Sequence, residues 1–187
     1  MNLKHHFLIA MPSIKNPLFR RSVVYIYQHS TEGAMGILIN KPIHKYTIKN
    51  ILNKLKINIE KNIDMDKLNH PVLFGGPLSD DRSFILHSPC YSFKSSVNIS
   101  REITITTSND IFNTIGTSSQ PEKILVALGC SEWGKGQLEQ EVIHNAWITT
   151  LANLKILFNT PIYDRWYESA KIIGIDIRNI SSEIGHS

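Results

Sequence analysis

The sequence has few cysteines and no long hydrophobic run. Its two cysteines, Cys90 and Cys130, form neither a Cys-x-x-Cys pair nor a set of regular spacings, so we expect no disulfide framework and no structural zinc site. The apolar run from Phe7 to Met11 ends at Pro12 and is too short for a signal-peptide core or a membrane span. These absences predict a cytoplasmic protein with no membrane partner.

Charge of one sign is not concentrated anywhere in the chain. The formal net charge is +4, but no run of five basic residues occurs and acidic residues are interleaved from Glu60 onward. Proteins that bind nucleic acid usually gather lysine and arginine into a face or stripe, so we do not expect a nucleic-acid partner. A hydrophobic fraction of 42% over 187 residues fits a globular chain, and we predict a single domain over residues 1–187.

The first half of the chain reads mainly as strands. Apolar runs predict strands at 7–11, 23–27 and 35–39, and the short polar turn between the last two predicts an antiparallel hairpin. Isoleucine and leucine at helical spacing after Thr47 predict a helix with that threonine as its N-cap. Residues 56–70 are polar and are predicted to form a surface loop.

The second half mixes both kinds of element. Strands are predicted at 72–74, 84–86, 103–107 and 124–128, the last as a central strand, and helices after Ser108, over 137–144 and after Pro161. Residues 129–136 are interpreted as a turn-rich loop because they contain three glycines. Most connections are too short for helical crossovers. The predicted fold is α+β, with a mixed, mainly antiparallel sheet and helices packed on it.

Four segments combine glycine, proline and polar residues near the ends of predicted strands. They are Gly33 to Gly36 with Asn40-Lys41-Pro42, Gly75-Gly76-Pro77 with the stretch to Ser88, Gly129 to Glu141, and Asn145-Ala146-Trp147. Two glycines permit positive φ or a close backbone approach, and a proline fixes the exit of a turn. Tight turns at two strand ends could also shape the wall of a ligand pocket.

Together these segments resemble the AlgH/YqgE family of bacterial proteins. FLIAMP, FRRSVVY, GAMGILINKP, GGPLSDDRSFILHS, WGKGQLEQE and the run from Thr160 to Asp176 all carry the resemblance, in the same order over nearly the whole chain. The resemblance implies a compact α+β fold whose sheet curls into a partial barrel. The family carries a label of transcriptional regulator and no established enzymatic activity. One departure is clear: where the family pattern is similar to Gly-Tyr-Ala-Gly-Trp, this chain has Cys130, Ser131 and Glu132 before the tryptophan.

No complete catalytic or metal-binding motif is present. Gly-Cys-Ser-Glu-Trp follows a predicted strand, but a nucleophile elbow needs glycine where Trp133 stands, so Ser131 is not assigned as a nucleophile. Cys130 is interpreted as a buried, inert thiol. The Gly-Lys-Gly at 134–136 lacks the full phosphate-binding pattern, although a helix N-terminus could hold an anion weakly. A single Glu-x-x-His pair, Glu141 and His144, predicts no metal site.

The sequence therefore identifies no catalytic residue, metal or cofactor, and leaves open whether the protein is an enzyme. The candidate ligand pocket consists of Asn40, Lys41, Gly75, Gly76, Pro77, His87, Trp133, Gln137 and Glu139. The favoured hypothesis is a non-catalytic binding or regulatory module that recognises an unknown small molecule or protein. The alternative is a nucleotide- or anion-binding protein, or an enzyme, with its site near the GGP and WGKGQLE segments. A DNA-binding transcriptional regulator has the least support.

Overall fold

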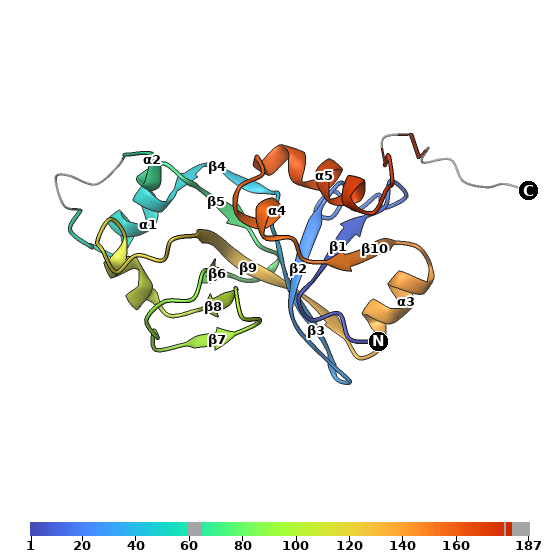
Figure 1. The fold of residues 1–187 in the computed structure, drawn as a ribbon, viewed down its shortest axis with the longest axis horizontal. Helices are drawn as coiled ribbons and strands as arrows, with labels where there is room; N and C mark the ends of the chain where they lie inside the picture. The colour runs from blue at the N-terminus through green and yellow to red at the C-terminus, as the bar shows by residue number, and fades with distance from the viewer. Residues whose placement is uncertain (60–64, 178, 181–187) are drawn as a thin grey trace, which may run out of the picture.

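The computed structural model describes residues 1–59, 65–177 and 179–180. Ten strands in this part of the chain form one sheet that curls into a half-barrel (Figure 1). The main path of the sheet runs in the order β10-β1-β2-β3-β9-β6-β8-β7, and β4 and β5 branch from it where β5 pairs with β9. The strands are β1 His6–Ala10, β2 Val23–Ser30, β3 Gly33–Leu38, β4 Pro42–Thr47, β5 Pro71–Phe74, β6 Leu78–His87, β7 Ser96–Asn98, β8 Thr104–Thr106, β9 Ile124–Gly134 and β10 Trp147–Leu151.

The predicted sheet type is confirmed. β2 and β3 form the expected antiparallel hairpin, closing at the pair Ser30 and Gly33. Among the described strands the parallel pairing is that of β5 with β9, and the remaining pairings are antiparallel. A short turn joins the antiparallel strands β2 and β3, whereas the parallel strands β5 and β9 are far apart in sequence, as a parallel pair requires.

Strand β9 joins the two parts of the sheet. Its first half pairs with β5 and β6, and its second half, from Ser131 to Gly134, pairs with β3. The prediction of a loop over 129–136 is therefore wrong as far as Gly134, because β3 supplies backbone partners that the glycines alone do not reveal. Gly129 has φ +75° at the point where β9 changes neighbours.

The region between β3 and β5 contains one strand that the sequence did not indicate. β4 is polar and half-exposed, and it forms because β5 pairs with it. Helix α1, Ile48–Lys54, follows as predicted, and the backbone N–H of its N-cap Thr47 donates to the Asn50 side chain at 2.8 Å. Within the predicted loop 56–70, residues 60–64 lie outside the described residues, and Met65–Leu68 forms a short helix, α2, with Leu68 buried.

The remaining helices follow the predicted positions closely. A 3-10 helix follows Ser108, α3 begins after Gly136, and Pro161 precedes the helical run that contains Trp166. Residues 156–158, an apolar run in the sequence, belong to a helix. The bounds are η1 Asn109–Thr114, α3 Gln137–Ile143, α4 Leu154–Phe158, η2 Ile162–Asp164 and α5 Arg165–Ile172.

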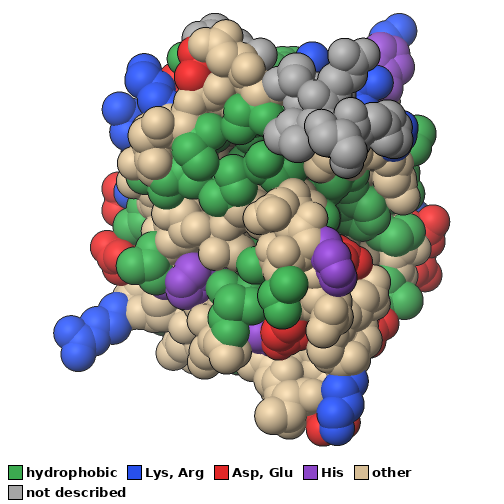
Figure 2. All heavy atoms as spheres, turned by 90° about the vertical axis from the view of Figure 1, so that its right-hand side faces the viewer, with side chains coloured by type: hydrophobic (Ala, Val, Ile, Leu, Met, Phe, Trp, Pro, Cys, Tyr) green, Lys and Arg blue, Asp and Glu red, His purple; other side chains and the backbone are tan. Residues whose placement is uncertain are grey.

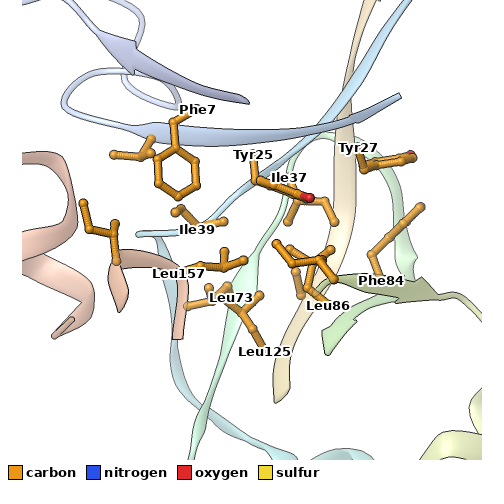
Figure 3. Packing of buried hydrophobic residues seen from close by; sticks show 14 of the residues in the cluster. Phe7, Tyr25, Tyr27, Ile37, Ile39, Leu73, Phe84, Leu86, Leu125 and Leu157 are labelled. Carbon is orange, nitrogen blue, oxygen red and sulfur yellow. The ribbon is translucent and has the colours of Figure 1, made fainter. Parts of the chain in front are cut away.

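The main hydrophobic core fills the inside of the half-barrel. Figure 3 shows side chains from β1, β2 and β3 facing those of β5, β6 and β9, with α4 and α5 contributing from one end. A second cluster lies between α3 and the opposite face of β1 to β3, and a third lies under α1 and η1. At the other end of the main core, the rings of Tyr27 and Phe84 lie with centroids 6.2 Å apart. This end is where the half-barrel opens.

Candidate functional site

The Gly75-Gly76-Pro77 turn is a crossing point of two backbones. A Cβ atom on Gly75 would lie 2.2 Å from the Gly129 carbonyl oxygen, and one on Gly76 would lie 2.2 Å from the Cys130 carbonyl carbon. Gly75 also donates its N–H to the Leu128 carbonyl at 2.7 Å. Both glycines are buried, whereas Pro77 is exposed. The turn therefore lets the chain leave β5 and enter β6 in direct contact with β9.

Asn40 and Lys41 hold the connection between β1 and β2. The buried Asn40 side chain accepts the Val23 N–H and donates to the Arg21 carbonyl, each at 2.8 Å. The Lys41 ammonium donates to the Arg20 carbonyl at 2.7 Å. Burial, and then the neighbouring charges of Arg20 and Arg21, lower the pKa of Lys41. Both side chains thus fix the backbone that carries two arginines.

His87 is a buried structural residue at the end of β6. One ring nitrogen lies 2.8 Å from the Ser88 carbonyl, which can only accept, so that nitrogen carries the proton. The other lies 2.8 Å from the Thr106 hydroxyl. Burial lowers the pKa of His87, so the ring is neutral near pH 7. Because its proton already points at a carbonyl, His87 cannot take one from the Cys90 thiol 3.8 Å away.

Trp133 and Gln137 converge on Glu141. The indole N–H groups of Trp133 and Trp147 both donate to Glu141 Oε2, at 3.0 and 2.7 Å, and the Gln137 amide donates to Oε1 at 2.9 Å. Phe19 packs its ring edge against Trp147, with centroids 5.9 Å apart. A carboxylate that accepts three such hydrogen bonds joins α3 to β9 and β10.

Glu139 takes part in a separate contact on the same helix. Its carboxylate lies 2.8 Å from His29 Nε2, and the Leu3 N–H donates to the other ring nitrogen of His29 at 2.8 Å. Figure 2 shows this end of the molecule, where hydrophobic side chains lie near the middle of the face and lysine and arginine side chains near its edge. The two large cavities described below include no residue of α3.

The nine predicted pocket residues therefore occupy four places. The GGP turn lies against β9, whereas Asn40 and Lys41 contact the β1–β2 connection. His87 lies against β8. The α3 region contains Trp133, Gln137 and Glu139. A ligand role for any of them stays a prediction.

A cavity of about 620 Å³ lies at the open end of the half-barrel, and we call it the barrel mouth. Its volume falls within the range of about 300–1,000 Å³ that small-molecule sites occupy. Residues of β2, β3, β6, β8 and β9 line it together with the segment around β7. The residues that matter most below are Tyr27, Met35, Arg82, Phe84, Lys94 and Cys130.

The floor of the barrel mouth is aromatic and contains sulfur. The Tyr27 hydroxyl donates to the Met35 sulfur at 3.5 Å and hydrogen-bonds with the Cys130 thiol. Burial raises the pKa of Tyr27 well above its usual range, so the hydroxyl keeps its proton. Sulfur is a weak acceptor, and a bound carbonyl or carboxylate oxygen would be a stronger partner for this hydroxyl.

The rim of the barrel mouth carries positive charge. The guanidinium carbon of Arg82 lies 5.9 Å from the centroid of the Phe84 ring, and one of its nitrogens donates to the Thr107 hydroxyl at 3.2 Å. Lys94 is exposed and also lines the cavity. An apolar floor below two cations favours a flat ligand that carries a negative group.

The geometry does not support a serine nucleophile, a reactive thiol or a metal site among the residues that the structure describes. Ser131 lies inside β9, where its buried hydroxyl faces the Gly75 carbonyl at 3.5 Å, so the strand-to-helix turn of a nucleophile elbow does not exist there. Burial raises the pKa of both the Cys130 and the Cys90 thiol, which leaves them protonated and weakly nucleophilic. Within the described ranges, no group of three histidine, cysteine or acidic side chains is placed to bind a metal ion.

Several residues of the barrel mouth, Met35, Arg82 and Cys130 among them, stand in segments that the sequence singled out, but none of them was placed in the candidate pocket. Tyr27 belongs to an ordinary strand pattern, and only the strand order β2-β3-β9-β6 brings these side chains to one cavity. No helix in the described part of the chain is long and apolar enough to span a bilayer.

The fold and the cavity define a half-barrel α+β protein with an open, partly cationic end. The AlgH-like family matches residues 7–178 of the sequence. A UPF0301 protein of Sodalis glossinidius and the UPF0301 protein YqgE of Escherichia coli are each 56% identical over 187 residues, covering 100% of both chains. The chain belongs to the AlgH-like family, as its motifs predicted.

Solved structures agree with this assignment. The solution structure of the AlgH protein from Pseudomonas aeruginosa aligns with a TM-score of 0.78 at 36% identity, covering 99% of this chain and 96% of that one. A crystal structure of a Corynebacterium diphtheriae protein aligns with a TM-score of 0.69 over 92% of this chain and 87% of that one; its 17% identity supports the fold alone.

Proposed function

We propose that this protein is a non-catalytic binding module that holds a small molecule in the barrel mouth. The observation that carries the proposal is the cavity itself, about 620 Å³ in volume, with an aromatic floor and cations at its rim. The chain would act as one domain in the cytoplasm, which its two unpaired thiols favour. A regulatory role would then follow from the effect of the ligand on a partner.

The ligand class follows from the lining. Tyr27 offers a buried hydroxyl donor whose partners are sulfur atoms, and Arg82 offers a guanidinium above the Phe84 ring. A planar apolar body would pack on Phe84, an acceptor oxygen would bind Tyr27, and a carboxylate or sulfonate would bind Arg82. We therefore infer an aromatic anion.

The test is a fluorescence titration with anilinonaphthalene sulfonate, which has this chemistry, supported by amide chemical-shift mapping. We expect saturable binding that shifts the amides of Gln28, Ser79 and Ser95, which line the cavity. Tyr27→Phe removes one hydrogen bond of about 1 kcal/mol and should weaken binding about fivefold. Tyr91→Phe, the same change at a residue 75% exposed outside the cavity, should have no effect.

A second variant tests the cavity rather than the hydroxyl. Cys130→Phe would fill the floor and abolish binding, whereas Cys90→Phe places the same side chain at an exposed position outside the lining. Arg82→Gln should weaken the binding of the sulfonate probe while leaving the fold intact, because the Arg82 side chain is exposed. Shifts confined to other surfaces, or equal binding by all variants, would refute a site in the barrel mouth.

A further inference from the structure

A second cavity, of about 710 Å³, shares no lining residue with the barrel mouth. It lies between α5 and the connection from β1 to β2, residues 12–21, which we call the arginine loop. The loop contributes Lys15, Arg20 and Arg21, and the other wall contributes the rings of Tyr163, Trp166 and Tyr167. Cations on one side and aromatic rings on the other give this cavity a character distinct from the half-barrel core.

Among the described residues, the ion pairs of the structure do not include the cations of this cavity. The ion pairs between described residues are His29 with Glu139, Lys135 with Glu32 and Lys171 with Glu168, and they involve no cation of the arginine loop. Lys41 lies next to the loop, outside the cavity lining, and its ammonium donates to the Arg20 carbonyl at 2.7 Å. Like charges held together repel, and a bound anion would relieve that repulsion.

The arginine loop is held by contacts from Asn40 and Trp166 and by a bond from the adjacent Ser22. The Asn40 amide donates to the Arg21 carbonyl at 2.8 Å, and the Ser22 hydroxyl donates to the Phe19 carbonyl at 2.7 Å. The guanidinium carbon of Arg21 lies 5.7 Å from the centroid of the Trp166 ring, and the Trp166 N–H is itself held by the Ala10 carbonyl at 2.8 Å.

The backbone of Arg21 also adopts φ +53°, which a non-glycine residue rarely takes without compensation. The surrounding bonds maintain this conformation and with it the direction of the side chain. A site whose cations are held in place before binding loses less conformational entropy when its ligand arrives.

We propose that this cavity binds a nucleotide, with its phosphate at Arg20 and Arg21 and its base against Tyr163 of η2 and Tyr167 of α5. The guanidinium group of an arginine binds two phosphate oxygens in a bidentate geometry, so Arg20 and Arg21 suit a phosphate ligand. Tyr163 is 82% exposed and lines the same cavity as the cations, so its ring is accessible as a stacking surface for a base. The site is independent of the proposed function, because it uses other residues.

The experiment is a calorimetric and chemical-shift titration of the full chain with adenosine monophosphate. We expect binding that shifts the amides of Arg20, Arg21 and the Trp166 indole. The double change Arg20→Gln with Arg21→Gln should weaken binding at least about tenfold, because charge-assisted hydrogen bonds are lost. Arg101→Gln, the same change at an exposed arginine outside the cavity, should leave the affinity unchanged.

Two further ligands separate the parts of the proposal. Inorganic phosphate should bind more weakly than the nucleotide and lose affinity in the double variant, whereas adenosine should bind far more weakly than the nucleotide. Equal binding of phosphate and nucleotide would overturn the stacking role, and equal binding of adenosine would overturn the role of the arginines. A single-stranded oligonucleotide that binds through the same arginines while the mononucleotide fails would replace the nucleotide with a nucleic acid.

Discussion

The contact between Gly76 and β9 predicts a large effect of a very small substitution. Gly76 has φ +152°, and a Cβ there would meet three backbone atoms of Cys130 and Ser131 within 2.5 Å. Real Cβ contacts stay above 3.0 Å, so Gly76→Ala requires the two backbones to separate by about 0.8 Å, from 2.2 to 3.0 Å. Neither backbone can move freely, because β9 is paired on both sides.

The expected loss combines two effects. The unfavourable φ contributes about 1–3 kcal/mol and the forced separation of a packed core about 1–3 kcal/mol, so Gly76→Ala should lower the free energy of unfolding by about 4 kcal/mol. Gly136→Ala is the matched control, because Gly136 also has positive φ but its Cβ would have no neighbour within 4 Å. That change should lower the free energy by only about 1–2 kcal/mol.

Thermal and urea unfolding of both variants measure the difference. At about 2–4 °C per kcal/mol for a chain of this size, Gly76→Ala should lower Tm by about 8–16 °C and the control by a few degrees. Equal shifts for the two variants would show that positive φ alone explains the glycine. The close approach of the two backbones would then not be the reason for the glycine at position 76.

Three other changes test the polar contacts. Glu141→Ala leaves two buried indole N–H groups without an acceptor and should lower the free energy of unfolding by about 2–4 kcal/mol, against less than about 0.5 for the exposed Glu32→Ala. Burial lowers the pKa of His87, so below about pH 6.5 the unfolded chain binds a proton at this histidine that the folded chain does not bind. The free energy of unfolding therefore falls as the pH falls toward the pKa of the folded state. His87→Asn should make the free energy of unfolding, measured in urea, depend less on pH in this range. Asn40→Ala removes a buried acceptor and a donor and should lower the free energy of unfolding by about 2–4 kcal/mol; Asn40→Asp keeps the acceptor for the Val23 N–H but sets a carboxylate oxygen against the Arg21 carbonyl oxygen, so it should not restore the original stability in urea unfolding at about pH 7.

Local patterns predicted the elements whose own residues determine them. The hairpin of β2 and β3 follows from apolar runs on either side of a short polar turn, and α1 follows from its N-cap and apolar spacing. β4 and the second half of β9 could not be predicted in this way. Both contain residues of weak strand preference, and they are extended because β5 and β3 supply their hydrogen-bond partners.

The candidate site was harder to predict than the fold for the same physical reason. Asn40 and Lys41 were singled out at a strand end as candidate pocket residues, but sequence alone could not show that their side chains bond to the arginine loop. A cavity is made by side chains from strands that are distant in sequence. Tyr27 and Phe84 meet because β2 and β6 lie on opposite sides of the half-barrel.

At residues 130–132 the sequence departs from the family pattern, and this difference affects the lining of the barrel mouth more than the pairing of the strands. Along β9, Ser131 and Trp133 face the side that α3 covers, and both stay buried there. Cys130 faces the half-barrel interior, and Glu132 lies exposed on the same side, where its charge acts on Cys130 and Tyr27. A cysteine where the family pattern has an aromatic ring leaves more space above the floor, because its side chain is smaller. The backbone pairing of β9 with β3 involves main-chain atoms and does not depend on this residue type. We therefore expect members of the family that differ at this position to share the half-barrel and to differ in the volume of the barrel mouth.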